Sequence, residues 1–186
     1  MKRSRLPEDF YEKIRPHLHE RAGRELRLAH RVLDIACGNC KLGAFLRRVY
    51  RQRVTGIDIT DARFPKRSNR RSRSPLRCIK ADGTRLKFLA DGSMDAAVMM
   101  WALHEMKDPS ATLREARRVL RPGGKILIID FPRGSLAQRL WKERYYTVFQ
   151  VERMLRQAGF GEIRSRKVER GQVLWTIGYR QPDRDI

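Results

Sequence analysis

Short apolar segments recur along the chain, separated by longer stretches in which apolar residues have a helical spacing. Two of the short segments, DAAVMM and KILIID, are almost continuously apolar, as expected for strands covered on both faces. The pattern predicts strands over residues 31–36, 53–59, 77–81, 95–100, 125–130, 162–168 and 172–179.

The stretches between these segments predict helices with recognisable ends. A helix over residues 109–120 has Asp108 in place as its N-cap. A helix over residues 148–158 begins at a capping box formed by Thr147 and Gln150. The other predicted helices are residues 42–51 and residues 8–28, the latter interrupted near Pro16.

Strands that alternate this regularly with helices predict an α/β fold with a parallel sheet, and no second domain or internal repeat is seen. One segment breaks the pattern. Residues 61–77, DARFPKRSNRRSRSPLR, lie where a helix should join the second and third strands, and Pro65 and Pro75 interrupt them. We predict an exposed, mobile basic loop, which is either a solvated connection or a flexible clamp for RNA or another polyanion.

The length and composition of the chain favour a single globular domain without a membrane span. The 186 residues suit one domain with a sizeable core, and no apolar run approaches the length of a membrane span. The three cysteines, with no signal-peptide pattern before them, predict free thiols and a cytoplasmic location. The formal charge of +21 favours contact with polyanions, although a solvated basic surface would also account for it.

The stretch DIACGNCKLG, residues 34–43, joins the first predicted strand to the following helix. It fits the G-x-G-x-x-G dinucleotide pattern poorly, because Ala36 and Cys40 stand among its glycines. Cys37 and Cys40 form a C-x-x-C pair, but with Cys78 alone elsewhere this is half of a zinc site at best, so no metal is expected. An acid beside glycines at a helix start suits a ligand that carries a cation.

These motifs, taken together, resemble the class I S-adenosylmethionine-dependent methyltransferases. The resemblance rests on VLDIACGNCKLGAFL, GIDI, KADGTRLKF, SMDAAVMMWALHEMKDP and EARRVLRPGGKILIIDF, which follow in this order over about residues 30–180. It is strongest for the small-molecule branch that includes the ubiquinone and menaquinone C-methyltransferases. The resemblance implies a Rossmann-like, doubly wound, seven-stranded sheet, mostly parallel with an antiparallel last strand and with helices on both faces. Within the single domain it implies an N-terminal helical cap over residues 1–29, a cofactor-binding core over 30–180 and an acceptor-side segment over 131–147.

The resemblance also implies S-adenosylmethionine as cofactor, with S-adenosylhomocysteine as product. Asp34, Ala36 and Gly38 match the motif beside the methionine part, and Asp58 matches the acid that binds both ribose hydroxyls. Singly, each acid could be a helix cap or turn residue, but acids at successive strand ends would share one crevice. The remaining implied cofactor contacts are Cys37 and Cys40 in the same motif, Ile59, Asp82 and Gly83 around the adenine, Met100 and Trp101 near the sulfonium, and Tyr11 from an N-terminal lid.

Candidate acceptor residues come from the segments after the fourth and fifth strands. His104 is the candidate general base, and the alternative is that it caps or packs the next helix. Glu105 could balance the cationic sulfonium or be a solvated residue. The segment FPRGSLAQRLWKERYYT adds Arg133, Tyr145 and Tyr146 as acceptor-binding candidates, although some of its aromatic residues could be helix core.

Three functions stay open at this point. The first is methyl transfer to a small molecule. The second is methyl transfer to RNA, with the basic loop and Arg47, Arg48, Arg51 and Arg53 as a phosphate track. The third is a binding module without transfer activity, suggested by Cys40 at a position where family members usually have glycine and by the missing helix after Asp58.

Overall fold

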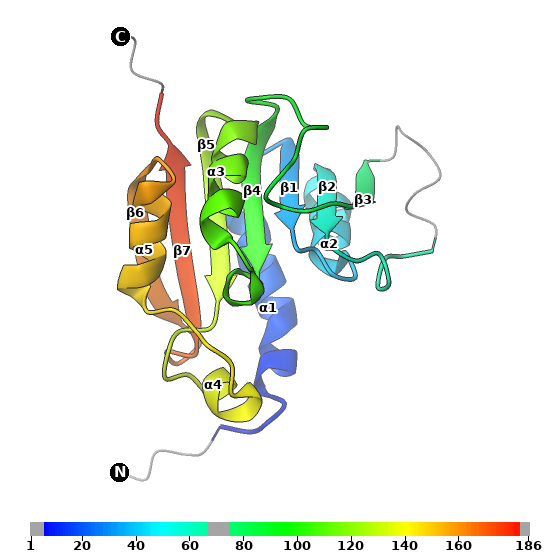
Figure 1. The fold of residues 1–186 in the computed structure, drawn as a ribbon. Helices are drawn as coiled ribbons and strands as arrows, with labels where there is room; N and C mark the ends of the chain where they lie inside the picture. The colour runs from blue at the N-terminus through cyan, green and yellow to red at the C-terminus, as the bar shows by residue number, and fades with distance from the viewer. Residues whose placement is uncertain (1–5, 67–74, 183–186) are drawn as a thin grey trace.

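A seven-stranded sheet passes through the middle of the protein in the computed structural model, which describes residues 6–66 and 75–182 (Figure 1). The order of its strands is β3-β2-β1-β4-β5-β7-β6. β7 pairs antiparallel with both β5 and β6, and the other pairings are parallel. The predicted fold class is therefore confirmed. The strands are β1 (Arg31–Ile35), β2 (Arg53–Asp58), β3 (Leu76–Lys80), β4 (Met94–Met100), β5 (Leu120–Asp130), β6 (Phe160–Val168) and β7 (Val173–Arg180).

Helices cover both faces of the sheet because the central strands are apolar on both sides. On β5, Leu127 and Ile129 pack with one cluster of core residues, whereas Ile126 and Ile128 pack with the other. The first cluster lies under α1 (Phe10–Glu25) and α2 (Lys41–Tyr50), and the second under α3 (Pro109–Val119) and α5 (Val148–Gln157). Two short helices, η1 (Leu103–Glu105) and α4 (Leu136–Trp141), follow β4 and β5 (Figure 1).

The strand order places a crevice at the carboxyl ends of the strands. The chain proceeds from β1 outward to β2 and β3 on one side, then returns to β4 and β5 on the other side of β1. In open α/β sheets this reversal leaves a gap beside the central strands, where ligands bind. The loops after β1, β2, β4 and β5 therefore meet at one edge of the sheet.

Two predicted elements differ from the observed ones. α1 continues through Pro16 without the expected interruption. Proline in a helix removes one hydrogen bond, but Tyr11 before it and Leu18 and Ala22 after it are buried in the core and hold both halves in line. β5 begins at Leu120, directly after α3, so it starts five residues before the strand predicted over 125–130 and includes the Pro-Gly-Gly sequence.

The basic loop is described only at its two ends. No helix forms over residues 61–66, and residue 76 already belongs to β3. Residues 67–74 of the predicted loop, and residues 1–5 of the predicted cap, lie outside the described residues. Within the described ranges, no helix is long and apolar enough to span a bilayer.

Candidate cofactor and acceptor site

The loop between β1 and α2 has the left-handed backbone that the glycine-rich sequence suggests. Ala36, Gly38 and Cys40 have φ angles of 56°, 53° and 56°. The backbone N–H of Cys37 donates to the Ile57 carbonyl over 2.9 Å, which fixes the loop against β2. A side chain at Gly38 would meet no atom within 4 Å, so glycine is needed there for its φ and the space above the loop is open.

Asp58 joins this loop to the end of β2. Its Oδ2 accepts a hydrogen bond from the Gly38 N–H over 2.9 Å, and its Oδ1 accepts from the Thr60 N–H over 3.1 Å. Each carboxylate oxygen has two lone pairs, so both keep the capacity to accept from a ligand. The next side chain, Ile59, is 68 % exposed beside it. The structure therefore brings together three residues that the sequence predicted for one ligand.

Asp34 lies beneath the same loop. Its side chain is buried, and its carboxylate accepts from the backbone N–H of Gly43 at the start of α2. Burial raises the pKa of Asp34 to about 7, and the negative charge of Asp58 adds to the rise against the opposing hydrogen bond. A buried carboxylate of this kind costs stability when it is ionised, and a nearby ligand cation would reduce that cost.

Asp82 and Gly83 follow β3 at the same edge of the sheet. The Asp82 carboxylate accepts from the Thr84 N–H over 2.9 Å and from the Thr84 hydroxyl over 2.8 Å, and these bonds lower the pKa of Asp82. This is the turn chemistry that the sequence offered as the alternative. A side chain at Gly83 would lie 3.1 Å from Thr112 of α3, so glycine allows this turn to approach the helix. Adenine contact by either residue stays a prediction.

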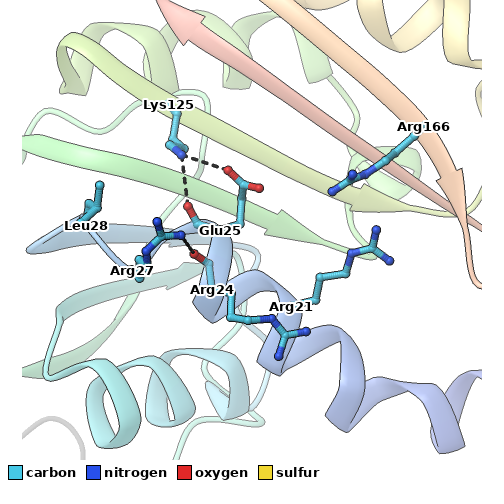
Figure 2. Close-up of a pocket in the computed structure, with 7 residues that line it drawn as sticks. All are labelled: Arg21, Arg24, Glu25, Arg27, Leu28, Lys125 and Arg166. Atoms are coloured by element: carbon cyan, nitrogen blue, oxygen red, sulfur yellow. Dashed lines mark hydrogen bonds and ion pairs between the residues drawn. The ribbon is translucent and has the colours of Figure 1, made fainter.

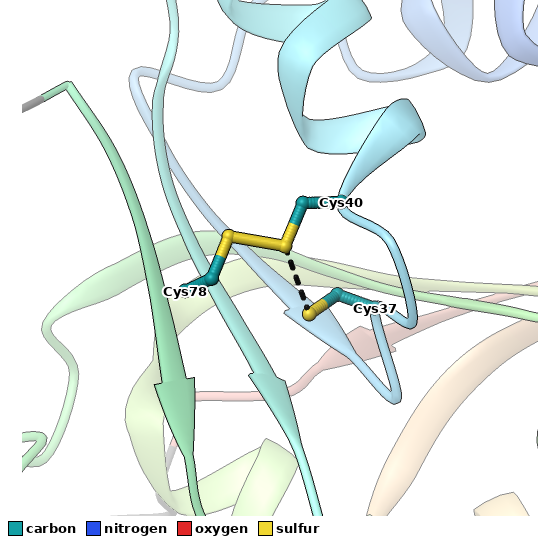
Figure 3. Close-up of side chains that lie close together, drawn as sticks. All are labelled: Cys37, Cys40 and Cys78. Carbon is teal, nitrogen blue, oxygen red and sulfur yellow. Dashed lines mark hydrogen bonds between the residues drawn. A yellow bond between two sulfur atoms is a disulfide. The ribbon is translucent and has the colours of Figure 1, made fainter. Parts of the chain in front are cut away.

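The three cysteines gather behind the loop, contrary to the expectation that Cys78 stands alone (Figure 3). Cys40 and Cys78 form a disulfide, and the Sγ of Cys37 lies 3.4 Å from that of Cys40. Gly56 explains the meeting: it is in register with Cys78 on β3, and a side chain there would lie 2.8 Å from the Cys37 sulfur. The prediction of free thiols is therefore wrong for Cys40 and Cys78, while Cys37 is free.

The disulfide also fixes the direction of the Cys40 side chain. Its side chain is buried and bonded toward β3, away from the open space above Gly38. A cysteine at this position therefore does not fill that space. Burial, together with the charges of Asp34 and Asp58, raises the pKa of the Cys37 thiol above its usual range.

Thiol counting tests this arrangement. The protein denatured without reductant and treated with iodoacetamide is expected to take up one carbamidomethyl group, at Cys37, because the other two sulfurs are bonded to each other. Reduction before alkylation should give three modified cysteines by mass spectrometry. Three modified cysteines without reductant would contradict the bond.

The acceptor side of the crevice is built around His104, in η1 just after β4. Its Nδ1 lies 2.7 Å from Oδ1 of Asp130, the last residue of β5, and its backbone N–H donates to Oδ2 of Asp130 over 3.1 Å. The Nε2 atom faces Glu143 at 3.2 Å and Glu105 at 3.9 Å. Burial acts to lower the pKa of His104, but the hydrogen bond and charge of Asp130, with the charges of Glu105 and Glu143, outweigh it and raise the pKa.

Aromatic side chains surround this histidine. The Tyr145 ring lies 4.6 Å from His104, and the Phe131 ring lies 5.3 Å from Trp101 and 4.6 Å from Tyr11 between ring centres. The Tyr11 hydroxyl accepts from the backbone N–H of Ala137 on α4, which ties α1 to the segment after β5. Trp101 has a φ of 57°, and in the described part of the chain its buried Nε1 has no hydrogen-bond partner.

The other predicted acceptor residues lie further from His104 or make different contacts. Arg133 is exposed, and its described hydrogen bond is a backbone one to the Tyr146 carbonyl. Tyr146 packs against the core under α3 and α5. Met100, predicted as a cofactor contact near the sulfonium, packs against the core under α1 and α2, and its cofactor contact stays a prediction. Sequence reasoning missed Asp130 and Glu143. An acid that ends a fifth apolar strand was the available signal for Asp130, because the same pattern had singled out Asp58.

Comparison with known proteins decides the family. A family model described as a methyltransferase domain matches residues 33–128, which is more than half of the chain. The chain belongs to the class I S-adenosylmethionine-dependent methyltransferases. The matched region holds the loop after β1, the end of β2 and the β4–η1 segment described above.

Relatives and solved structures agree with this family. The chain is 34% identical over 110 residues to 27-O-demethylrifamycin SV methyltransferase of Amycolatopsis mediterranei, covering 57% of this chain and 40% of that protein. It is 28% identical over 124 residues to demethylmenaquinone methyltransferase of Desulfitobacterium hafniense, covering 63% and 48%. The chain thus spans less than half the length of these two curated relatives. The structure of Burkholderia thailandensis 1,6-didemethyltoxoflavin-N1-methyltransferase, with 1,6-didemethyltoxoflavin and S-adenosylhomocysteine bound, shares the fold with a TM-score of 0.64 at 20% identity, covering 94% of this chain and 84% of that chain.

The residues of the crevice fit S-adenosylmethionine, the cofactor of this methyltransferase family. The Asp58 carboxylate has spare acceptor capacity for ribose hydroxyls, and exposed Ile59 offers an apolar surface to a base. Open space above Gly38 leaves room for a ligand close to the backbone. The unpartnered Nε1 of Trp101 is a donor at the end of β4.

Replacing Asp34 by asparagine should stabilise this methyltransferase at neutral and basic pH. The native-state pKa of about 7 is above the ordinary 3.8, so the unfolded state loses the proton first and the stability of the wild type falls as pH rises between these values. Asparagine can still accept the Gly43 hydrogen bond without a charge. We expect urea titration at pH 8 to show a gain of about 1–4 kcal/mol that shrinks toward pH 4.

The exposed residue Asp61 supplies the matched control, because Asp61→Asn removes one charge at the surface. Its effect on stability should stay within about 0.5 kcal/mol across the same pH range. The free energies of unfolding of the wild type and of Asp34→Asn could instead differ by the same amount at pH 4 and pH 8. Asp34 would then not be the group that makes stability depend on pH.

Proposed function

We propose that the chain transfers a methyl group from S-adenosylmethionine to a small-molecule acceptor that loses a proton to His104. The observation that carries the proposal is the His104–Asp130 pair, held at 2.7 Å where β4 and β5 end and enclosed by aromatic rings. It lies at the same edge of the sheet as the loop held by Asp58.

The cofactor side of the crevice has a positioning task. The Asp58 carboxylate would hold the ribose, and the backbone of the loop at Gly38 would lie against the methionine part. When bound, S-adenosylmethionine supplies an electrophilic methyl group on a sulfonium. Because that methyl group is already activated, the protein contributes chiefly by aligning the acceptor and excluding water. The buried rings of Phe131, Tyr11 and Tyr145 would exclude water.

The acceptor side has a proton-transfer task. Asp130 accepts from Nδ1 of His104, which leaves Nε2 as the basic nitrogen of the neutral imidazole. In that form Nε2 can take a proton from an acceptor hydroxyl, amine or carbon acid. Asp130 also stabilises the imidazolium that results. Glu143 and Glu105, which face Nε2, would then carry the proton toward solvent because both are largely exposed.

The relatives support a small acceptor. The proteins from Amycolatopsis and Desulfitobacterium are named for methylation of a rifamycin and of demethylmenaquinone, and the Burkholderia enzyme holds a small acceptor in its structure. The aromatic surroundings of His104 suit a flat organic acceptor of this kind. RNA as acceptor stays a prediction, because residues 67–74 of the basic loop lie outside the described residues.

Methyl-labelled S-adenosylmethionine tests the proposal directly. The purified protein is incubated with it and with separate fractions of small molecules, lipids, RNA and protein, beside the His104→Ala variant. We expect label in the small-molecule or lipid fraction with the wild type and little with the variant. Label in RNA would favour the second function, and cofactor binding without transfer to any fraction would favour a binding module.

A further inference from the structure

A cavity away from the crevice is lined mainly by cations, together with Glu25 and Leu28. It has a volume of about 370 Å³ and lies between the last two turns of α1, the loop that follows, and the strands β5 and β6. Figure 2 shows Arg166 extending from β6 toward Arg21 of α1. The cationic lining residues are Arg21, Arg24, Arg27, Lys125 and Arg166.

Carboxylates neutralise only part of this charge. Lys125 Nζ pairs with Glu25 at 3.0 Å, Arg21 lies 3.7 Å from Glu169, and Arg24 lies 4.0 Å from Glu20. The other two cations, Arg27 and Arg166, have no carboxylate partner among residues 6–66 and 75–182. Two guanidinium groups therefore face the cavity without a counter-charge.

The cations also repel one another. Burial lowers the pKa of the Arg21 guanidinium, and the charge of Arg166 lowers it further, although Glu169 and Glu25 act in the opposite direction. Five cations and one carboxylate, that of Glu25, line the cavity, and this excess of positive charge is unfavourable until an anion occupies it.

Helix stabilisation explains only some of the charge. Cations near the last turn of α1 offset the negative end of the helix dipole, and Arg24 and Arg27 are placed for that role. Lys125 of β5 also serves the end of α1, because its Nζ donates to the Glu25 carbonyl over 3.1 Å. Arg166 comes from β6 and makes no such bond to the helix. The position of Arg166 indicates a site formed by the tertiary fold.

The cavity is separate from the crevice. Lys125 lies five positions before Asp130 on β5, so the two are roughly 17 Å apart along the strand. Lys125 is therefore set back from the edge that holds His104 and Asp58. The backbone of Arg166 is nearer to that edge, because Arg166 is opposite Trp175 and Trp175 is opposite Ile129 of β5. The cavity is on the face of the sheet that α1 covers. A ligand here would not be the group that receives the methyl.

We infer that this cavity binds a small anion that carries a phosphate group. Guanidinium groups present paired N–H donors that match phosphate oxygens, and two unneutralised cations match the charge of a phosphate dianion. Leu28, 81 % exposed at the rim, gives an apolar contact for an organic group attached to that phosphate. The size of the cavity suits a small molecule.

Isothermal titration calorimetry in phosphate-free buffer tests the inference. Inorganic phosphate, tripolyphosphate and AMP are titrated into the wild type and into the double variant Arg27→Ala/Arg166→Ala. We expect one site for tripolyphosphate or AMP, and affinity roughly ten-fold or more weaker in the double variant because two charge-assisted contacts are lost. Tighter binding of AMP than of inorganic phosphate would identify a phosphate ester as the ligand, and the reverse order would identify free phosphate or a polyphosphate.

The matched control is Arg85→Ala/Arg153→Ala, which removes two exposed arginines, one from the segment after β3 and one from α5, and gives the same net charge. It should bind like the wild type, and thermal melting should show that both double variants are folded. Equal weakening in both double variants would overturn the inference in favour of diffuse attraction by the net charge. A second result would also overturn the inference: the double variant Arg27→Ala/Arg166→Ala binds an RNA oligonucleotide more weakly than the wild type does, while its binding of tripolyphosphate is unchanged or undetected.

Discussion

Replacing Asp58 by alanine is expected to weaken the binding of S-adenosylmethionine by about two to four orders of magnitude. A carboxylate that accepts from two ribose hydroxyls makes charged hydrogen bonds, each worth about 1.5–3 kcal/mol. The variant also removes the acceptor for the Gly38 N–H and so loosens the loop after β1. Calorimetric titration with S-adenosylhomocysteine, which avoids turnover, measures the loss.

Asp61→Ala gives a matched control three positions along the chain. Asp61 is exposed, and its ion pair with Lys80 at 3.4 Å is a surface one, so removing it should change cofactor affinity by only a few-fold. Asp58→Asn separates charge from shape, because it keeps an acceptor oxygen for Gly38 and loses the negative charge. Wild-type affinity in a folded Asp58→Ala variant would place the ribose elsewhere.

The fold and the meeting of Asp58 with the loop after β1 could be predicted from the sequence because they depend on local signals. Each central strand is a short apolar run, and residues such as Asp58 and Asp82 follow directly at its end. In a parallel sheet those ends share one edge, so contiguous motifs are enough to place Asp58 next to Gly38. Helix caps are local signals as well, and the capping box at Thr147 is present as predicted.

The features that escaped prediction depend on residues far apart in the chain. Asp130 meets His104 across 26 positions, and Cys78 meets Cys40 across 38. Glycine at position 56 makes room for the sulfurs, but its sequence context gives no sign of what fills that room. The contacts of Tyr11 with Phe131 and with the Ala137 N–H also join distant segments. Only the folded arrangement brings these partners together. Contact of Tyr11 with the cofactor stays a prediction.

The second large effect is expected at His104. If this residue is the general base, His104→Ala should lower the turnover number by about 10²–10⁴-fold, the usual contribution of such a group. Cofactor affinity should stay near the wild-type value, because His104 contacts Asp130 and Glu143 and none of the predicted ribose or methionine residues. Asp130→Asn should also lower turnover, since it disturbs the tautomer that leaves Nε2 basic. His17→Ala, which removes an exposed histidine of α1, serves as the control.

The pH dependence distinguishes a base from a residue that only packs. A general base acts in its neutral form, so turnover should rise as pH passes the raised pKa of His104. Glu143→Gln removes one of the charges that raise this pKa, and the rise should move to lower pH. Histidine NMR titration should show the same shift without any acceptor. Protonation of His104 has the opposite effect on the stability of the fold. The His104–Asp130 pair contributes its full stabilisation below pH 6.5, the ordinary pKa of histidine. This contribution is lost as pH rises through the raised pKa of His104. The opposite result is that Glu143→Gln shifts the NMR titration of His104 but leaves the pH dependence of turnover unchanged. That result would make His104 a structural residue, and the acceptor would then lose its proton without it.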